Sequence, residues 1–326
     1  MFYVKANKAQ KIEPITFAEL NFRESDIEEL LRSNIDMICD EEESMLIVGR
    51  QVRNAKHGRS DLTAVDNNGN IVLIEIKRDP KDIELRSEAF EFQAIRYAAS
   101  YATIEDPEDL VNKIYGPYIE KYRDEYEHQT LTSVELGMRI LTEFLQANGA
   151  EHTFNNRQKV ILVASDFDEQ TLSAVAWLNS NGVNMSCYKL IPHKINEEVY
   201  INVEKVLPLA DYNDYFVNFL EPATAIKAPR KGLTRRSLPK IDAMLDWGVV
   251  NEGDIIRAKD RDEEATLLAN GHVLVDGDEK SLQKWLKDIY GWSSVQTYVF
   301  AIHKESGKSL SEIREEYMDK KIDEAE

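Results

Sequence analysis

The stretch DLTAVDNNGNIVLIEIKRD, residues 61–79, places an acid and a lysine in and beside a strongly apolar run. Apolar residues occupy positions 71–74 and 76 and so lie on both faces of the strand, which predicts that both faces are buried, because a half-exposed strand would alternate. Charged side chains at the end of such a strand require a partner or a function. The simpler interpretation is that Glu75 and Lys77 face water on an edge strand.

A short turn divides this stretch into two strands. Residues 67–69, Asn-Asn-Gly, fit a three-residue hairpin loop that closes with a glycine in the left-handed conformation. Asp66 would then pair with Asn70, and counting outward places Asp61 opposite Glu75 on one face. A two-residue loop would shift the pairing by one and turn Asp61 to the other face. The sequence therefore predicts an odd-numbered or bulged loop.

In that register two carboxylates and an ammonium group converge at one end of a buried sheet, because Lys77 shares the face of Glu75. Two buried carboxylates repel each other, and one lysine offsets only half of that charge. A divalent cation such as Mg²⁺ or Mn²⁺ would offset the rest. A bound metal and a lysine near a water molecule suit phosphodiester hydrolysis.

The composition bounds the function classes. The chain has 326 residues, enough for two domains, and a formal charge of −19, which argues against a general nucleic-acid coat protein. No apolar run is long enough for a membrane span, and the N-terminus lacks the apolar core of a signal peptide. Two cysteines cannot form a disulfide framework, so we expect reduced cysteines and a cytoplasmic protein without a membrane partner.

Two basic runs stand out against the negative total charge. They are typical of solvated loops, but their positions, beside the hairpin and at a domain boundary, favour contacts to a DNA backbone. The cations concerned are Arg50, Arg53, Lys56 and Arg59 in the first run, and Arg235 and Arg236 in the second.

Strands that alternate with helices predict an α/β fold with a mixed central sheet flanked by helices. Pro- and small-residue-rich residues 221–235 predict a linker between a domain of residues 1–220 and a small α+β domain of residues 236–326. We expect helices at residues 24–38, 82–102, within 107–148, 169–179, 281–289 and 309–319. We expect strands at residues 45–53, 60–66, 70–78, 160–164, 184–190, 199–206, 254–259, 264–269, 272–275 and 298–303.

The N-terminal motifs together resemble the PD-(D/E)xK nuclease superfamily, in its NucS-like and restriction-endonuclease-like branch. The matching residues are Gly58-Arg59-Ser60-Asp61, then Glu75-Ile76-Lys77, then a helix with Gln93 and Tyr97. The resemblance covers about residues 20–205. Ser60 stands where the family name has a proline, at a position that varies within the superfamily.

The resemblance implies a restriction-endonuclease-like fold and a role for each matching residue. Asp61 and Glu75 would bind Mg²⁺ or Mn²⁺, and Lys77 would position or activate the attacking water. Gln93 would contact metal-site waters or the DNA backbone, and Tyr97 would support it one helical turn away. Ordinary helix packing is the alternative for Gln93 and Tyr97.

The family pattern also includes an upstream glutamate. Glu24, Glu28 and Glu29 are the candidates, and Glu28 is preferred because it shares a helix face with apolar residues of the helix expected at 24–38. A capping box of Ser25 with Glu28 is the competing interpretation.

The C-terminal domain resembles the RAMA domain, a module found beside restriction and methylase enzymes. The matching stretches are residues 241–254, the turn at 276–277, Ser281 with its helix, and residues 309–314. The resemblance implies DNA recognition, with Trp285, Trp292 and Tyr298 as candidates for stacking on a base. Formation of the small domain core is the alternative for these three aromatic residues.

These observations predict a metal-dependent DNA endonuclease that acts in restriction or defence against modified or foreign DNA. A repair nuclease for branched or mismatched DNA would use the same chemistry. A nuclease fold that only binds DNA, as a scaffold, is the alternative from another class. Double-strand cutting often needs two active sites, so a homodimer fits the mechanism.

Overall fold

The computed structural model describes residues 2–5, 7–39, 41–54, 58–79, 89–126, 130–208 and 238–325. The chain divides into two compact units, one of residues 1–38 and 45–208 and the other of residues 39–44 and 209–326. The predicted linker at 221–235 lies outside the described residues. Within the described residues no helix has both the length and the apolar character to span a membrane.

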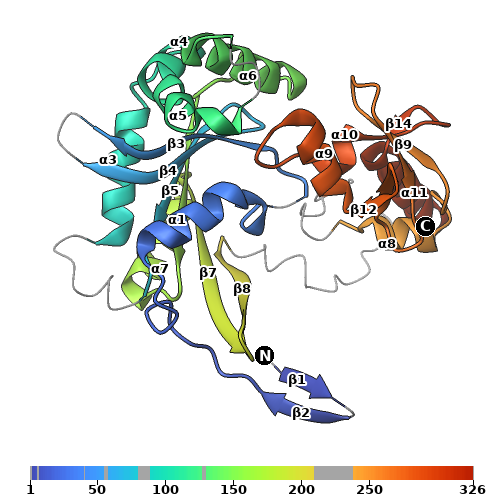
Figure 1. Cartoon of the computed structure of the whole chain (residues 1–326), viewed down its shortest axis with the longest axis horizontal. Coiled ribbons are helices and arrows are strands. Elements are labelled where there is room, and N and C mark those ends of the chain that lie inside the picture. The colour runs from blue at the N-terminus through green and yellow to red at the C-terminus, as the bar shows by residue number, and fades with distance from the viewer. Residues whose placement is uncertain are drawn as a thin grey trace, which may run out of the picture. The chain divides into compact units, whose positions relative to one another are not determined.

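The N-terminal unit is built on a mixed six-stranded sheet with strand order β3-β4-β5-β6-β7-β8 (Figure 1). The three central strands β5, β6 and β7 run parallel, and the remaining neighbours are antiparallel. The predicted α/β class is therefore confirmed. The strands are β3 (Met45–Arg53), β4 (Arg59–Asp66), β5 (Ile71–Ile76), β6 (Gln158–Ala164), β7 (Asn184–Ile195) and β8 (Glu198–Leu207).

Helices pack on this sheet because each presents an apolar face to it. Helix α1 (Glu24–Ser33) contacts β4 and β5, α3 (Phe90–Tyr101) contacts β4, β5 and β6, and α7 (Glu169–Ser180) contacts β7 and β8. A short hairpin of β1 (Phe2–Lys5) and β2 (Lys8–Lys11) forms a separate two-stranded sheet. The predicted helical region 107–148 consists of α4 (Pro107–Leu110), the π-helical turn Val111–Tyr115, α5 (Gly116–Lys121), the short turn Arg123–Glu125 and α6 (Ser133–Ala147).

The two helices nearest the opening motif differ from prediction. Helix α1 starts at Glu24 and ends at Ser33, because the Asn34 side chain donates to the Leu30 carbonyl; a separate short turn follows at Ile35–Met37. The Ser25 capping box is therefore wrong, since both Ser25 and Glu28 lie inside the helix. Helix α3 begins at Phe90, and residues 82–88 of its prediction lie outside the described residues.

The β4–β5 hairpin has the predicted register. The Asp66 amide donates to the Asn70 carbonyl at 3.0 Å, and the strand pairing runs from Val65 opposite Ile71 to Leu62 opposite Ile74. Gly69 closes the three-residue loop at φ +80°, in the left-handed region that favours glycine. The odd-numbered loop is thus confirmed, and it sets the face on which each side chain of the hairpin lies.

The C-terminal unit is a small antiparallel sheet with helices, in the strand order β12-β11-β10-β9-β13-β14. Its strands are β9 (Ile255–Ala258), β10 (Glu264–Leu267), β11 (Val273–Val275), β12 (Asp278–Lys280), β13 (Ala301–His303) and β14 (Lys308–Ser309). Its helices are α8 (Ile241–Asp246), α9 (Leu282–Tyr290), α10 (Thr297–Phe300) and α11 (Leu310–Ala325). The strand expected at 298–303 starts only at residue 301, because the Phe300 amide donates to the Gln296 carbonyl in a helical turn.

A segment from the N-terminal half of the sequence belongs to this second unit. Residues 39–44 cluster with it, and the Gln296 amide donates to the Ser44 hydroxyl at 2.9 Å. Arg314, only 1% exposed, forms an ion pair of 2.9 Å with Glu42. A chain cut at the linker would leave this segment without the groups it binds.

We predict that Gly69→Ala destabilises the protein more than Gly182→Ala. Both glycines have positive φ, so each alanine costs roughly 1 kcal/mol of backbone strain. A Cβ at Gly69 would also lie 3.1 Å from the Ala150 carbonyl oxygen and 3.2 Å from the Phe154 Cα, whereas a Cβ at Gly182 meets nothing within 4 Å. Chemical denaturation of the two variants measures the difference, and equal losses would contradict the predicted packing of the loop.

Candidate metal and DNA site

Asp61 lies where strands β4 and β5 part. The last paired residues of the two strands are Leu62 and Ile74, and beyond them the Asp61 carboxylate accepts a hydrogen bond of 2.7 Å from the Ile76 amide. The side chain thus takes the role of the backbone carbonyl that would accept this hydrogen bond if the strand pairing continued. The bond holds Asp61 at the end of the hairpin. Asp61 is buried, as is Lys77, the other predicted residue at this end.

Three carboxylates meet at this point. Oxygen atoms of Glu24, Glu28 and Asp61 lie within 4.8 Å of one another. The two glutamates are four residues apart on α1, so they share the helix face that packs on β4 and β5. The preferred residue Glu28 is therefore in the cluster, Glu24 joins it, and the third candidate, Glu29, instead forms ion pairs with Arg32 and Arg50.

A buried lysine, a half-buried arginine and an amide surround the three carboxylates. The Lys77 Nζ lies 3.1 Å from Glu24 Oε1 and 3.9 Å from Asp61 Oδ2, and the lysine side chain is 1% exposed. Arg50 Nε lies 3.2 Å from Glu28 Oε2, and Gln51 Nε2 donates to both carboxylate oxygens of Glu28. Gln51 was missed from the sequence, because only the fold brings β3 beside α1.

The electrostatics of the cluster favour an additional positive charge. Burial raises the pKa of Asp61 to about 6; the Lys77 ammonium and the Ile76 amide oppose this rise, and the neighbouring carboxylates of Glu24 and Glu28 contribute to it. A bound cation would oppose both the burial and the two neighbouring carboxylates, because it favours the charged form of Asp61. Three carboxylate donors at this spacing fit a hard divalent cation such as Mg²⁺ or Mn²⁺.

Glu75 lies outside that three-carboxylate group, although the register places it opposite Asp61. It is completely buried, and Gln93 Nε2 lies 3.4 Å from its Oε2 atom. Gln93 also reaches the Tyr97 hydroxyl at 3.5 Å, and that hydroxyl accepts a hydrogen bond of 3.1 Å from the Arg59 amide. Gln93 and Tyr97 thus connect α3 to Glu75 and to the start of β4, and a metal-ligand role for Glu75 stays a prediction.

A basic groove adjoins the carboxylate cluster. Its volume is about 380 Å³, and the described residues that line it include five cations and no carboxylate. Arg50 and Gln51 line it and also contact Glu28, so the groove reaches the cluster. The five cations are Arg50, Arg53, Arg59, Lys113 and Lys121.

The cations predicted to contact DNA differ in their exposure to solvent and in the partners that they bind within the protein. Arg53 and Arg59 pair across β3 and β4 and are exposed, whereas Arg50 is engaged with Glu28, Glu29 and the Tyr122 hydroxyl. Lys113 and Lys121 were missed, because the sequence gives no local sign that α5 and the turn before it lie beside β3. The predicted cations Lys56, Arg235 and Arg236 lie outside the described residues.

The aromatic residues expected to stack on a base are in the core of the C-terminal unit. Trp285, Trp292 and Tyr298 are 3%, 3% and 2% exposed. Tyr298 accepts a hydrogen bond from the Ile241 amide, and the Trp292 ring packs edge-on against Phe300. Base stacking requires an exposed ring face, so the structure supports the alternative that these residues form the core.

We predict that Mn²⁺ binding to this site depends on pH through Asp61. Because its pKa is raised to about 6, Asp61 is protonated in the free protein below that pH, and binding must release the proton. Apparent affinity should fall as pH falls through 6, by up to about tenfold per pH unit, with about one proton released near pH 5 and close to none near pH 8.

Titration calorimetry in buffers of different ionisation enthalpy measures both quantities. Asp61→Asn is the matched control, because asparagine can still accept the Ile76 hydrogen bond but offers neither a proton nor a charge, so both Mn²⁺ binding at this site and the linked proton release should be lost. Binding that is independent of pH, or a proton release that persists in Asp61→Asn, would contradict the prediction.

No protein-family model and no curated protein sequence matches this chain. The functional conclusion therefore depends on the geometry of the site and on the motifs in the sequence.

Proposed function

We propose that the N-terminal unit is a metal-dependent endonuclease that hydrolyses phosphodiester bonds of DNA. The observation that carries the proposal is a buried lysine, Lys77, held beside Glu24 and Asp61 within a group of three carboxylates. A structural ion pair would need one acid for one base, and this site holds more acid than its bases offset. The excess suits a divalent cation, and the lysine beside it suits hydrolysis.

Each residue then has a chemical role. Glu24, Glu28 and Asp61 would hold Mg²⁺ or Mn²⁺, which when bound polarises the phosphate and makes a coordinated water more acidic. The Lys77 ammonium would orient the attacking water and offset negative charge that develops on the phosphate. Gln51 and Arg50 would keep the Glu28 carboxylate in one orientation, since both donate to it.

The basic groove supports DNA as the substrate. A duplex or single strand carries one negative charge per nucleotide, and cationic side chains bind it in proportion to the phosphates they neutralise. In a chain with a net charge of −19, a groove lined by five cations and, among the described residues, no carboxylate is a local exception. Its contact with the Glu28 partners would place a bound phosphate near the metal ligands.

We further propose that the C-terminal unit directs this activity to modified or foreign DNA in the cytoplasm, as its resemblance to the RAMA domain implies. A repair role on branched or mismatched DNA would use the same catalytic residues and would appear as a substrate preference. A silent scaffold would bind metal and DNA without cutting any substrate.

We predict that Asp61→Asn and Lys77→Met each lower DNA cleavage at least about a hundredfold, the range for loss of a group that acts on the reacting atoms. Methionine keeps the length and packing of Lys77 but removes its charge, so Mn²⁺ binding should persist in that variant. Lys194→Met, at a lysine whose side chain is 45% exposed, is the matched control and should cut as the unchanged protein does.

The assay uses plasmid, single-stranded and modified phage DNA with Mg²⁺ or Mn²⁺. Cleavage that survives Asp61→Asn would contradict the site. Folded protein that cuts none of the substrates would favour the scaffold.

A further inference from the structure

Asp79 is a buried carboxylate that the proposed reaction does not use. It follows β5 in the sequence and is only 5% exposed. Its Oδ1 atom accepts a hydrogen bond of 3.2 Å from the Phe17 amide, and its Oδ2 atom accepts one of 3.2 Å from the Ala18 amide. Arg78 Nε lies 3.2 Å from Oδ2 and offsets part of the charge. One carboxylate therefore joins the end of β5 to backbone 62 residues earlier in the sequence.

The backbone that Asp79 binds belongs to a tight turn just before α1. Phe17 is fully buried there, its carbonyl accepts a hydrogen bond of 2.9 Å from the Phe22 amide, and the two rings stack with their centroids 5.9 Å apart. A buried amide such as that of Phe17 needs an acceptor, and Asp79 supplies it. Helix α1 begins at Glu24, directly after this turn, so the place of the turn sets where the helix starts.

Both ends of this connection lead to charged groups of the candidate site. Lys77 is two residues before Asp79, and Glu24 is six residues after Ala18. Lys77 Nζ lies 3.1 Å from Glu24 Oε1. The Lys77 amide donates to the Val163 carbonyl at 2.8 Å, which fixes the lysine backbone against β6. Glu24 is the first residue of α1, so its place depends on the chain that enters the helix.

A purely structural role is the alternative interpretation, because aspartates commonly accept hydrogen bonds from backbone amides at the start of a turn or helix. Asp168 does so in the same unit, where its Oδ1 atom accepts a hydrogen bond of 2.8 Å from the Thr171 amide at the start of α7. Helix α7 carries none of the three clustered carboxylates. Asp79 differs from Asp168 because the backbone on both sides of its hydrogen bonds leads to the candidate site.

We propose that Asp79 is a positioning residue for the candidate metal site. It holds the turn before α1 against the end of β5 and thereby keeps Glu24 beside Lys77. The inference rests on the proposed function, in which Glu24 binds the metal and Lys77 orients the attacking water. Replacing a group that holds a metal ligand in place typically costs about 10- to 100-fold in metal affinity or activity.

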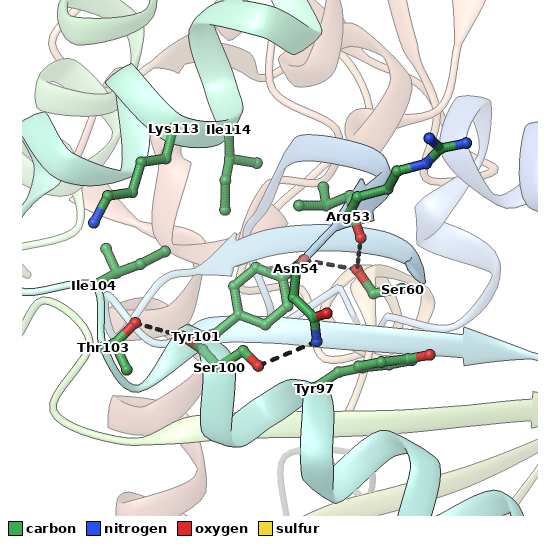
Figure 2. Close-up of a pocket in the computed structure, with 11 residues that line it drawn as sticks. Arg53, Asn54, Ser60, Tyr97, Ser100, Tyr101, Thr103, Ile104, Lys113 and Ile114 are labelled. Atoms are coloured by element: carbon green, nitrogen blue, oxygen red, sulfur yellow. Dashed lines mark hydrogen bonds between the residues drawn. The ribbon is translucent and has the colours of Figure 1, made fainter. Parts of the chain in front are cut away.

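Asp79 is separate from the surfaces proposed to bind DNA. The described residues that line the basic groove, and the cavity of about 500 Å³ beside it, do not include Asp79, Phe17 or Ala18. That cavity is formed by parts of β3, β4, α3 and the π-helical turn, and it shares Arg53 and Lys113 with the groove (Figure 2). A change at Asp79 should therefore alter metal binding and leave the affinity for DNA unchanged.

Three variants distinguish positioning from general stabilisation. Asp79→Ala removes both acceptor atoms. Asp79→Asn keeps the size of the side chain, but its amide nitrogen is a donor and would face one of the two backbone N–H groups. Asp168→Ala is the matched control for Asp79→Ala, because it also removes a carboxylate that accepts from a backbone amide. The measurements are Mn²⁺ titration calorimetry, binding of a DNA duplex in EDTA, and crystal structures in EDTA.

Both Asp79 variants should bind Mn²⁺ about 10- to 100-fold more weakly than the unchanged protein and should bind the DNA duplex equally well. Crystals of a folded Asp79 variant should show that the 3.1 Å contact between Lys77 and Glu24 is lost. Asp168→Ala should keep the Mn²⁺ affinity and this contact, although it lowers the melting temperature. Circular dichroism identifies a variant that fails to fold, and the other Asp79 variant then decides.

Equal Mn²⁺ affinities of the Asp79 variants and the unchanged protein, or an intact contact between Lys77 and Glu24 in the variant crystals, would overturn the inference. Loss of the fold in both Asp79 variants would overturn it too, because Asp79 would then stabilise the whole unit. The two proposals fail separately. A protein that binds Mn²⁺ and cuts no DNA loses only the nuclease function, and if it binds no Mn²⁺ the crystal contact still decides the role of Asp79. A protein that cuts DNA but keeps its Mn²⁺ affinity in Asp79→Asn loses only the positioning role.

Discussion

The three-residue loop between β4 and β5 is the constraint on which the candidate site depends. Side chains alternate along a strand, so a loop shorter by one residue would turn Asp61 away from the helix that carries Glu24 and Glu28. The left-handed glycine at position 69 and the Asp66–Asn70 closure fix that parity, and the pairing then continues to the point where the strands part. There the Asp61 carboxylate accepts a hydrogen bond from the Ile76 amide in place of a backbone carbonyl, and it lies beside the carboxylates of Glu24 and Glu28.

The acidic cluster that results is unfavourable by itself. Three carboxylates within 4.8 Å repel one another in a buried setting, and Lys77 with a share of Arg50 offsets only part of the charge. An arrangement that weakens the fold is typical of functional sites, where a bound ligand restores the balance. Burial, with the two neighbouring carboxylates, raises the pKa of Asp61, and a proton or a cation at this carboxylate would relieve the repulsion.

Features that depend on residues close together in the sequence could be predicted from local patterns. The hairpin register follows from turn chemistry, and most strands follow from apolar runs, so these could be predicted from sequence. Gln51 and Lys113 could not be predicted, since each gains its role from an element distant in sequence, and only the fold separates Glu24 and Glu28 from the third candidate, Glu29. The same holds for residues 39–44, which cluster with the second unit through contacts such as Glu42 with Arg314. The opposite error concerns aromatic residues that the sequence marked as candidates for base stacking. The sequence does not show that the core buries them, as it does Trp285, Trp292 and Tyr298.

The most direct test of the central claim is anomalous diffraction from crystals that contain Mn²⁺. The account predicts one strong manganese peak between Glu24, Glu28 and Asp61, with carboxylate oxygens at roughly 2.0–2.2 Å, and no peak at this position in Asp61→Asn. A Mn²⁺-containing crystal with no peak between these three carboxylates, or with the same peak in Asp61→Asn, would contradict it.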